Sequence, residues 1–185
     1  TSGIFKFSYQ KNMKKQFVSL AFCLCITSLI AAQQTLFEVL PDESSKKILK
    51  GFIQKMQLTE DPDFAWYGET LKYFKPQAEA IKTIQAKANL FQVVLFLGTW
   101  CEDSHQLVPK YLATLEAAGF AEDRLTLIAT DRKKQAPANL HIPFGIVNVP
   151  TLLVMKDGKE VGRIVEYGDA TRADKQLSAI VSGIQ

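Results

Sequence analysis

The chain has 185 residues, of which 47% are hydrophobic and 22% are charged, a composition that excludes a disordered protein. Its 22 basic and 19 acidic side chains give a net charge of +3, but four of the basic ones, all lysines, lie in residues 1–32, which contain no acidic residue. Residues 33–185 therefore hold 18 basic and 19 acidic side chains, a balance that argues against a nucleic-acid-binding surface.

Residues 1–32 have the pattern of a secretory signal peptide. Two lysines follow Met13, an apolar run covers residues 17–32, and the run ends in two alanines. We expect cleavage near residue 33 and a mature protein outside the cytoplasm. The apolar run is shorter than the roughly 20 residues of a membrane-spanning helix, so a membrane association is expected only if this segment is retained as an anchor.

The cysteines divide unevenly between the two parts of the chain. Cys23 and Cys25 lie inside the apolar run, which leaves Cys101 as the one cysteine of the mature protein. A single cysteine in an oxidising compartment cannot form an internal disulfide. Even together with His105 and His141, it falls short of the four ligands of a structural zinc site. We expect no metal and no cofactor.

Residues 33–87 are predicted to form a helical N-terminal extension. After an acidic start, apolar residues follow the spacing of one helix face: Ile48, Leu49, Phe52, Ile53 and Met56. Residues 61–75 are rich in aromatic side chains and are expected to pack across the domain, with a substrate-binding aromatic surface as the alternative. Pro76 begins a second predicted helix that runs through Ala88.

Residues 88–185 have the pattern of an α/β domain. The nearly continuous apolar run of residues 91–97 predicts a strand buried on both faces. A helix ending at Gly119 and a second buried strand over residues 125–130 follow. Asp157 and Gly158 predict the turn of a hairpin between strands 151–155 and 161–165, and residues 171–184 are predicted to form an amphipathic helix. This order predicts a parallel crossover followed by an antiparallel hairpin.

Cys101 lies between the first buried strand and the helix that follows it. Free backbone N–H groups and the helix dipole stabilise a thiolate at such a position. The alternative is a small buried hydrophobic residue, the usual role of cysteine. Functional sites gather at strand-to-helix junctions of α/β folds, and Glu102, Asp103 and Ser104 are polar, which favours a reactive cysteine.

The segment Trp100-Cys101-x-x-Ser104 resembles the Trp-Cys-x-x-Cys motif of the thioredoxin superfamily, with serine in place of the second cysteine. Pro109 falls where the helix of that family carries a proline. The Val-Pro-Thr sequence at residues 149–151 resembles the cis-proline loop of the family. Three features in this order make the resemblance specific.

The resemblance covers residues 91–185 and, with the signal peptide, is greatest to exported thioredoxin-like proteins of Gram-negative bacteria. It implies a thioredoxin-like α/β fold, with a central mixed sheet flanked by helices, preceded by the helical extension of residues 33–87. It also implies a periplasmic location, or an attachment to the inner membrane if the signal segment is retained.

The resemblance also assigns roles to five residues. Cys101 takes the position of the attacking cysteine and Ser104 that of the resolving cysteine. Trp100, Val149 and Pro150 take the positions that contact the substrate, where the backbone before the proline would pair with an extended client. Protein thiols or disulfides are the implied partners, and an external thiol is the implied reductant.

The serine implies an exchange that stops at a mixed disulfide. The Cys101 thiolate would attack a client disulfide, and Ser104 could donate a hydrogen bond to that thiolate but could not displace the client. Leu95 stands where the family has a buried acid that assists resolution, so both resolving groups are missing together. The alternative is a thioredoxin-fold binding module without turnover.

Two further groups near this segment are expected to have no role in the chemistry. His105 is interpreted as an exposed helix residue, which would assist the thiol only if it were protonated and turned toward the sulfur. Residues 131–134, Asp-Arg-Lys-Lys, are interpreted as a solvated loop after a strand, with contact to a partner as the alternative.

Overall fold

The computed structural model describes residues 36–44, 46–166 and 172–185. The predicted signal peptide, with Cys23 and Cys25, lies outside the described residues, and its export function stays a prediction. In the described part of the chain, none of the helices combines the length and the apolar character needed to cross a membrane.

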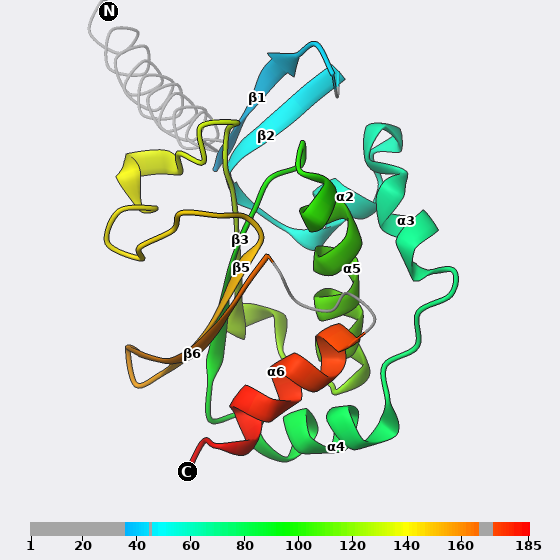
Figure 1. The fold of residues 1–185 in the computed structure, drawn as a ribbon, viewed down its shortest axis with the longest axis vertical. Helices are drawn as coiled ribbons and strands as arrows, with labels where there is room; N and C mark the ends of the chain where they lie inside the picture. Colours follow the sequence, from blue (N-terminus) through cyan, green and yellow to red (C-terminus); the bar gives the residue numbers. More distant parts are fainter. Residues whose placement is uncertain (1–35, 45, 167–171) are drawn as a thin grey trace, which may run out of the picture. The chain divides into compact units, whose positions relative to one another are not determined.

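A six-stranded mixed sheet with the order β1-β2-β4-β3-β5-β6 forms the centre of the fold (Figure 1). Only β3 and β4 pair in parallel, and the other neighbouring strands of this sheet are antiparallel. The parallel crossover and the terminal hairpin predicted from the sequence are therefore confirmed. The strands are β1 (Phe37–Asp42), β2 (Lys46–Ile53), β3 (Gln92–Leu97), β4 (Leu125–Ala129), β5 (Thr151–Lys156) and β6 (Lys159–Val165).

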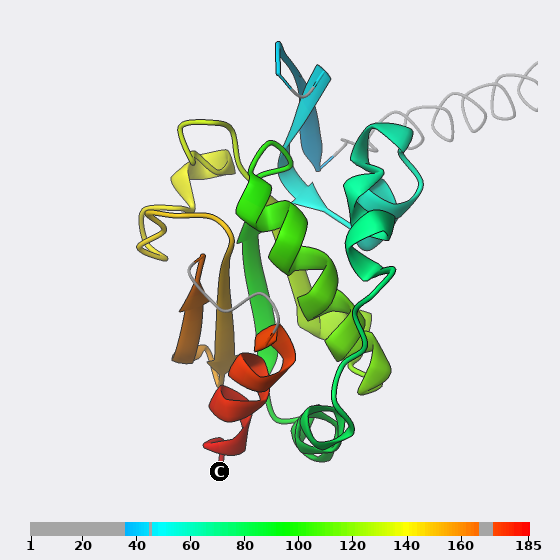
Figure 2. The same ribbon diagram turned by 45° about the vertical axis from the view of Figure 1, so that its right-hand side comes forward.

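The larger helices cover one face of this sheet, as Figures 1 and 2 show from two directions. The segment between β4 and β5, which includes a short 3-10 helix at Pro137–Asn139, lies on the other face. The helices are α2 (Lys55–Thr59), α3 (Trp66–Leu71), α4 (Ala78–Lys87), α5 (Glu102–Ala117) and α6 (Ala173–Ser182), and two further 3-10 helices span Pro62–Phe64 and Glu122–Arg124.

Strand β3 is buried on both faces, as its apolar run predicted. Alternate side chains of a strand point to opposite faces, and Val93, Leu95 and Leu97 accordingly join the main core beneath the helices. Phe96 points the other way, into a smaller apolar cluster that also contains Ile128 and Val149. The C-terminal end of β3 is therefore packed between two apolar clusters, which fixes the backbone from which the following loop begins.

The prediction of a helix around residues 48–56 is wrong, because residues 46–53 form β2. Apolar residues at positions 48, 49, 52 and 53 fit a helix face, but Gly51 sits in the middle of that run at φ +137°, a backbone conformation that no helix contains. A Cβ at Gly51 would lie 2.5 Å from the carbonyl oxygen of Leu36. Pairing with β1 and β4 supplies the backbone hydrogen bonds instead.

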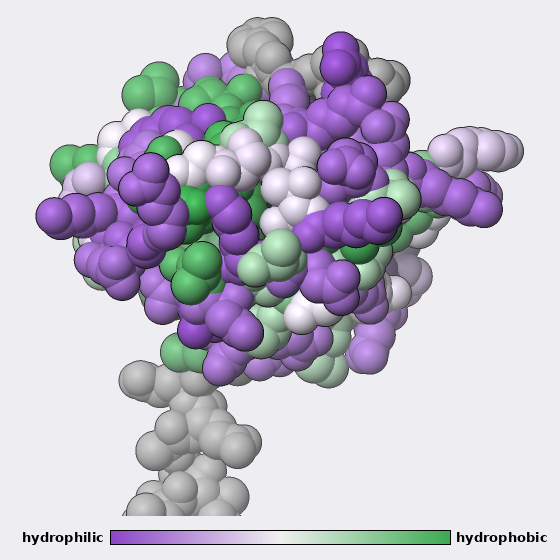
Figure 3. Space-filling model, turned by 90° about the horizontal axis from the view of Figure 1, so that it is seen from below, coloured by the Kyte–Doolittle hydropathy of each residue, from purple (hydrophilic) through white to green (hydrophobic). Residues whose placement is uncertain are grey.

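The helix predicted from Pro76 is confirmed as α4, and the final helix as α6. The two helices pack together, and Asp174 of α6, 2% exposed, accepts a hydrogen bond of 2.7 Å from the backbone N–H of Gln77 at the start of α4. Figure 3 views the end of the molecule that carries α4, where the surface is largely hydrophilic and hydrophobic side chains form only small groups. The boundary expected at residue 88 stays a prediction.

Candidate active site

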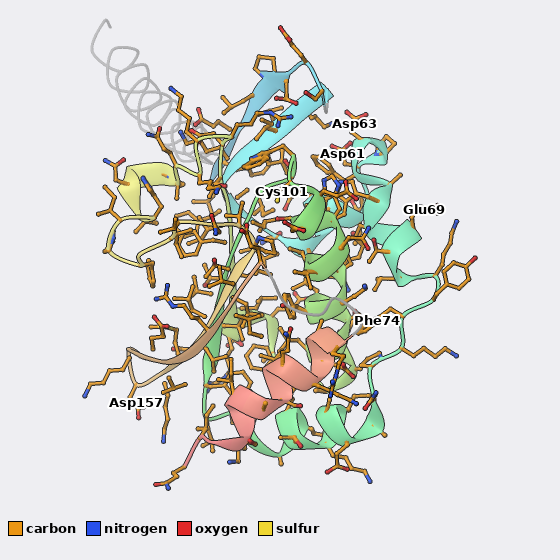
Figure 4. The ribbon with its side chains drawn as sticks, in the orientation of Figure 1. Asp61, Asp63, Glu69, Phe74, Cys101 and Asp157 are labelled. Carbon is orange, nitrogen blue, oxygen red and sulfur yellow. The ribbon has the colours of Figure 1, made fainter. Side chains whose placement is uncertain are left out.

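Cys101 lies at the junction between β3 and α5, as the sequence predicted (Figure 4). Its backbone is extended, with φ −97° and ψ 123°, and its carbonyl oxygen accepts the hydrogen bond from His105 N–H that starts the helix. The side chain is half-buried and is a free thiol. The thiol therefore stands at the positive end of a 16-residue helix, where backbone N–H groups stabilise a negative charge.

The thiol faces the loop that precedes β5. Cys101 Sγ lies 3.1 Å from the carbonyl oxygen of Val149, to which it donates a hydrogen bond. The Val149–Pro150 peptide bond is cis, and the Thr151 hydroxyl donates to the carbonyl oxygen of Asn148 at 2.7 Å. The structure thus brings Cys101, Val149 and Pro150 together from two distant segments.

Trp100 is held on three sides. Its indole Nε1 donates a hydrogen bond of 2.9 Å to the carbonyl oxygen of Thr130. The ring lies against Gly98, where a Cβ would approach the indole to 2.8 Å. The guanidinium of Arg132 lies 5.4 Å from the ring centroid, a cation–π distance. These contacts fix the position of the Trp100 ring next to Cys101, and only a glycine at position 98 leaves room for that ring.

Ser104 has a different contact from the one the sequence suggested. Its side chain is fully buried, and its Oγ accepts a hydrogen bond of 3.1 Å from the backbone N–H of Gly98. Among the hydrogen bonds of the described residues, none joins Ser104 to Cys101. In this structure Ser104 therefore holds the loop of residues 98–101 rather than the thiol.

His105 is not the exposed residue that the sequence suggested, since its side chain is 17% exposed. Its Nε2 lies 2.9 Å from the carbonyl oxygen of Thr99, and its ring stacks on Trp66 at a centroid distance of 4.3 Å. Glu102 approaches the other ring nitrogen at 3.5 Å. Trp66 therefore belongs to the surroundings of the site, and the aromatic segment packs against the first turn of α5.

Thr99 connects the site to β2 through a contact that no local sequence pattern indicates. Its hydroxyl oxygen accepts a hydrogen bond of 3.1 Å from the backbone N–H of Leu49, 50 positions away. Both residues are buried. The helix predicted around Leu49 would bond its N–H group within the helix, whereas in β2 this N–H is free to reach Thr99.

Residues 131–134 are not simply a solvated loop. Lys50 Nζ lies 2.8 Å from Asp131 Oδ2, and Arg132 donates two hydrogen bonds to the carboxylate of Asp42 at 2.5 and 2.7 Å. Burial alone would raise the pKa of Asp131, but the bond from Lys50 and two backbone N–H groups lower it below its ordinary value. The loop is thus bound to the β1–β2 hairpin.

Apolar side chains pack beneath the thiol, while the two acidic residues that follow it are exposed. Cys101 and Trp100 pack on the smaller apolar cluster, whose buried members include Phe96 and Val149. On the loop before Val149, the side chains of Ile142 and Val147 are exposed at 67% and 74%. In the described part of the chain, no group of three or more His, Cys, Asp or Glu residues is placed to hold a metal ion. The arrangement places a free thiol on a small apolar cluster, next to the backbone of Val149.

Comparison with known proteins identifies the same part of the chain. The family model of thioredoxin matches residues 74–182 and so begins ahead of the expected boundary at residue 88. Thioredoxins of Listeria monocytogenes and Listeria innocua are each 28% identical to this chain over 86 residues, which are 46% of this chain and 79% of each relative.

The fold is also that of solved structures. A protein of unknown function from Pseudomonas aeruginosa superposes with a TM-score of 0.51 at 15% identity, over 65% of this chain and 82% of that chain. At this identity the likeness shows the fold alone. The predicted thioredoxin-like fold, a mixed sheet flanked by helices, is confirmed.

Proposed function

This chain belongs to the thioredoxin family, and from that premise we propose that it is an exported thiol–disulfide exchange protein that works through Cys101 alone. The observation that carries the proposal is the position of the Cys101 thiol. It stands at the start of α5 and lies 3.1 Å from the carbonyl oxygen of Val149, beside the cis peptide bond to Pro150. In the proposed exchange, an extended client would pair with the backbone at Val149, next to the thiol.

The first step is an attack by the Cys101 thiolate on one sulfur of a client disulfide. A bond forms between Cys101 Sγ and that sulfur, while the disulfide of the client breaks. The second client sulfur leaves as a thiolate and takes up a proton from water. The product is a mixed disulfide, and no cysteine in the described part of the chain can resolve it, because Cys101 is the free cysteine there.

An external thiol completes the cycle. Its thiolate attacks Cys101 Sγ in the mixed disulfide, which releases the client as a dithiol and leaves the external thiol bound to Cys101. A second thiol molecule then forms a disulfide with the first and restores the Cys101 thiol. Two external thiols are oxidised to one disulfide for each client disulfide that is reduced, so atoms and electrons balance.

The alternative is a binding module without turnover, and one contact favours it. The hydrogen bond from the Cys101 thiol to Val149 exists only while the sulfur is protonated. A protein that keeps this bond would present the surface of Trp100 and Pro150 to a partner without reacting. Such a protein would form no covalent adduct.

The direct experiment is intact-mass spectrometry of the protein after incubation with a disulfide-bonded peptide. We expect an adduct with the mass of one peptide that disappears on reduction. The variant Cys101→Ala should form none, and Ser104→Ala, which keeps the thiol, should still form it. No adduct on the wild-type protein would contradict exchange and support the binding module.

Export is a separate part of the proposal and has its own test. It rests on the lysine pair, the apolar run and the two alanines before residue 33. N-terminal sequencing of the protein from fractionated cells should find a start near residue 33 in the periplasm. An intact Met13 terminus in the cytoplasm would overturn the assignment without affecting the proposed chemistry.

A further inference from the structure

We propose that Arg132 is a positioning residue of this site, which acts through Trp100 and is itself held by Asp42 of the β1–β2 hairpin. The inference rests on the proposed function, because it assigns Arg132 to the docking of a protein client beside Cys101. Arg132 would fix the indole that the client contacts, and would thereby favour protein disulfides over small ones.

The hairpin holds the guanidinium in one orientation. Arg132 Nε and a terminal nitrogen bond the two carboxylate oxygens of Asp42 at 2.5 and 2.7 Å. Such a paired contact fixes the plane of the guanidinium as well as its distance. The carboxyl side chain of Asp42 is 9% exposed, so the anchor itself is nearly buried.

The fixed guanidinium lies over the indole. Its central carbon is 5.4 Å from the centroid of the Trp100 ring, within the range of a cation–π contact. The edge of the indole is held by Thr130, whose carbonyl oxygen accepts a hydrogen bond of 2.9 Å from the indole N–H. Gly98 closes a third side. Without Arg132, the indole would keep its hydrogen bond but lose the contact that covers its ring.

A second ion pair makes the connection to the hairpin firm. Lys50 of β2 lies 2.8 Å from Asp131, the residue next to Arg132. Asp131 and Arg132, which follow β4, are thus bound to β2 and β1 respectively. Each pair of residues is separated by more than 80 positions in the sequence. The β1–β2 hairpin lies outside the match to the thioredoxin family, and through Arg132 it contacts the Trp100 ring of the site.

The test compares two substrates for each variant: a disulfide-bonded peptide and a small aromatic disulfide, dithiodipyridine. For Arg132→Ala, we expect the rate constant of Cys101 with the peptide to fall about three- to fivefold, the loss that one exposed cation–π contact represents. The rate constant with the small disulfide should stay the same, because that reagent needs only an accessible thiol. Asp42→Asn should give a smaller change in the same direction.

Two further variants separate positioning from general stability. Arg132→Lys keeps a cation over the ring but loses the paired contact, so it should restore part of the peptide rate. Lys55→Ala is the matched control, because Lys55 forms an ion pair of 2.5 Å with Glu116 that does not involve Trp100, and it should leave both rates unchanged. In a Trp66→Phe background, the emission of Trp100 should shift for Arg132→Ala and not for Lys55→Ala.

The outcomes distinguish this inference from the proposed function. If wild-type protein fails to react with the peptide, the proposed function is overturned. If wild-type protein reacts and Arg132→Ala gives the same ratio of peptide to small-disulfide rates, with unchanged Trp100 emission, the role of Arg132 is overturned. Should Arg132→Ala fail to fold, Asp42→Asn applies the same comparison with the side chain of Arg132 retained.

Discussion

The sulfur of Cys101 and the carbonyl oxygen of Val149 lie 3.1 Å apart, although 48 positions separate the two residues. The thiol can donate this hydrogen bond and a thiolate cannot. Ionisation of Cys101 therefore frees the Val149 carbonyl at the moment when the sulfur becomes nucleophilic. In the proposed exchange, a client N–H group would take the place of the thiol on this oxygen, which would align an extended segment beside the attacking sulfur.

Ser104→Ala tests the structural role of the buried serine. The substitution removes the acceptor of the Gly98 N–H and leaves a buried backbone donor without a partner, so we expect a loss of about 1–3 kcal/mol in the free energy of unfolding. Urea denaturation measures it. Ser182→Ala, where the hydroxyl is exposed and only bonds within its own helix, should change stability by less than about 0.5 kcal/mol.

Ser104→Cys tests whether the two positions of the motif meet. We expect the variant to form a disulfide with Cys101 under mild oxidation and to reduce insulin faster than the wild-type protein, because the second thiol can now release the client. A mass loss of two hydrogen atoms and the insulin turbidity assay report the two effects. Free thiols at both positions after oxidation would show that the motif has been misaligned.

Gly98→Ala tests how Trp100 is held. The new Cβ would lie 2.8 Å from the indole, so the ring must move, and overpacking of this kind costs about 1–3 kcal/mol. We expect lower stability, a shifted emission of Trp100 and a slower reaction of Cys101 with peptides. Gly68→Ala is the matched control: its Cβ meets no atom within 4 Å, and in α3 it should stabilise by up to about 1 kcal/mol. Equal effects of the two substitutions would contradict the account.

Asp131→Asn tests the ion pair with Lys50 through pH. The folded state lowers the pKa of Asp131 below its unfolded value, so the charged form stabilises the fold above that unfolded value, near pH 4, and the contribution disappears as the pH falls through the folded pKa. We expect the difference in unfolding free energy between wild type and variant to be largest above about pH 5. It should shrink below about pH 4. A difference that stays constant from pH 7 to pH 3 would exclude this role.

Local patterns predicted the second half of the fold well. Residues 91–97 are apolar almost without interruption, a pattern typical of a strand buried on both faces, and β3 lies between the two cores. Asp157 and Gly158 form the turn between β5 and β6 as their types predict. In both cases the information lies within a few neighbouring residues.

The predictions that proved wrong concern residues whose structure depends on contacts between distant parts of the sequence. Residues 48–56 satisfy a helical pattern, yet pairing with β1 and β4 makes most of them a strand. Arg132 was assigned to solvent because nothing beside it in the sequence shows that Asp42 lies within 2.7 Å. His105 was placed on an exposed face because its partner Trp66 comes from a segment whose location the sequence did not reveal.

The most direct test of monothiol exchange is the turnover of a disulfide-bonded peptide by glutathione in the presence of catalytic amounts of the protein. Exchange through Cys101 predicts a reduction rate above the uncatalysed background, more than one peptide reduced per protein molecule, and a return to background for Cys101→Ala. A rate equal to background with the wild-type protein, or an acceleration that survives in Cys101→Ala, would contradict exchange through Cys101.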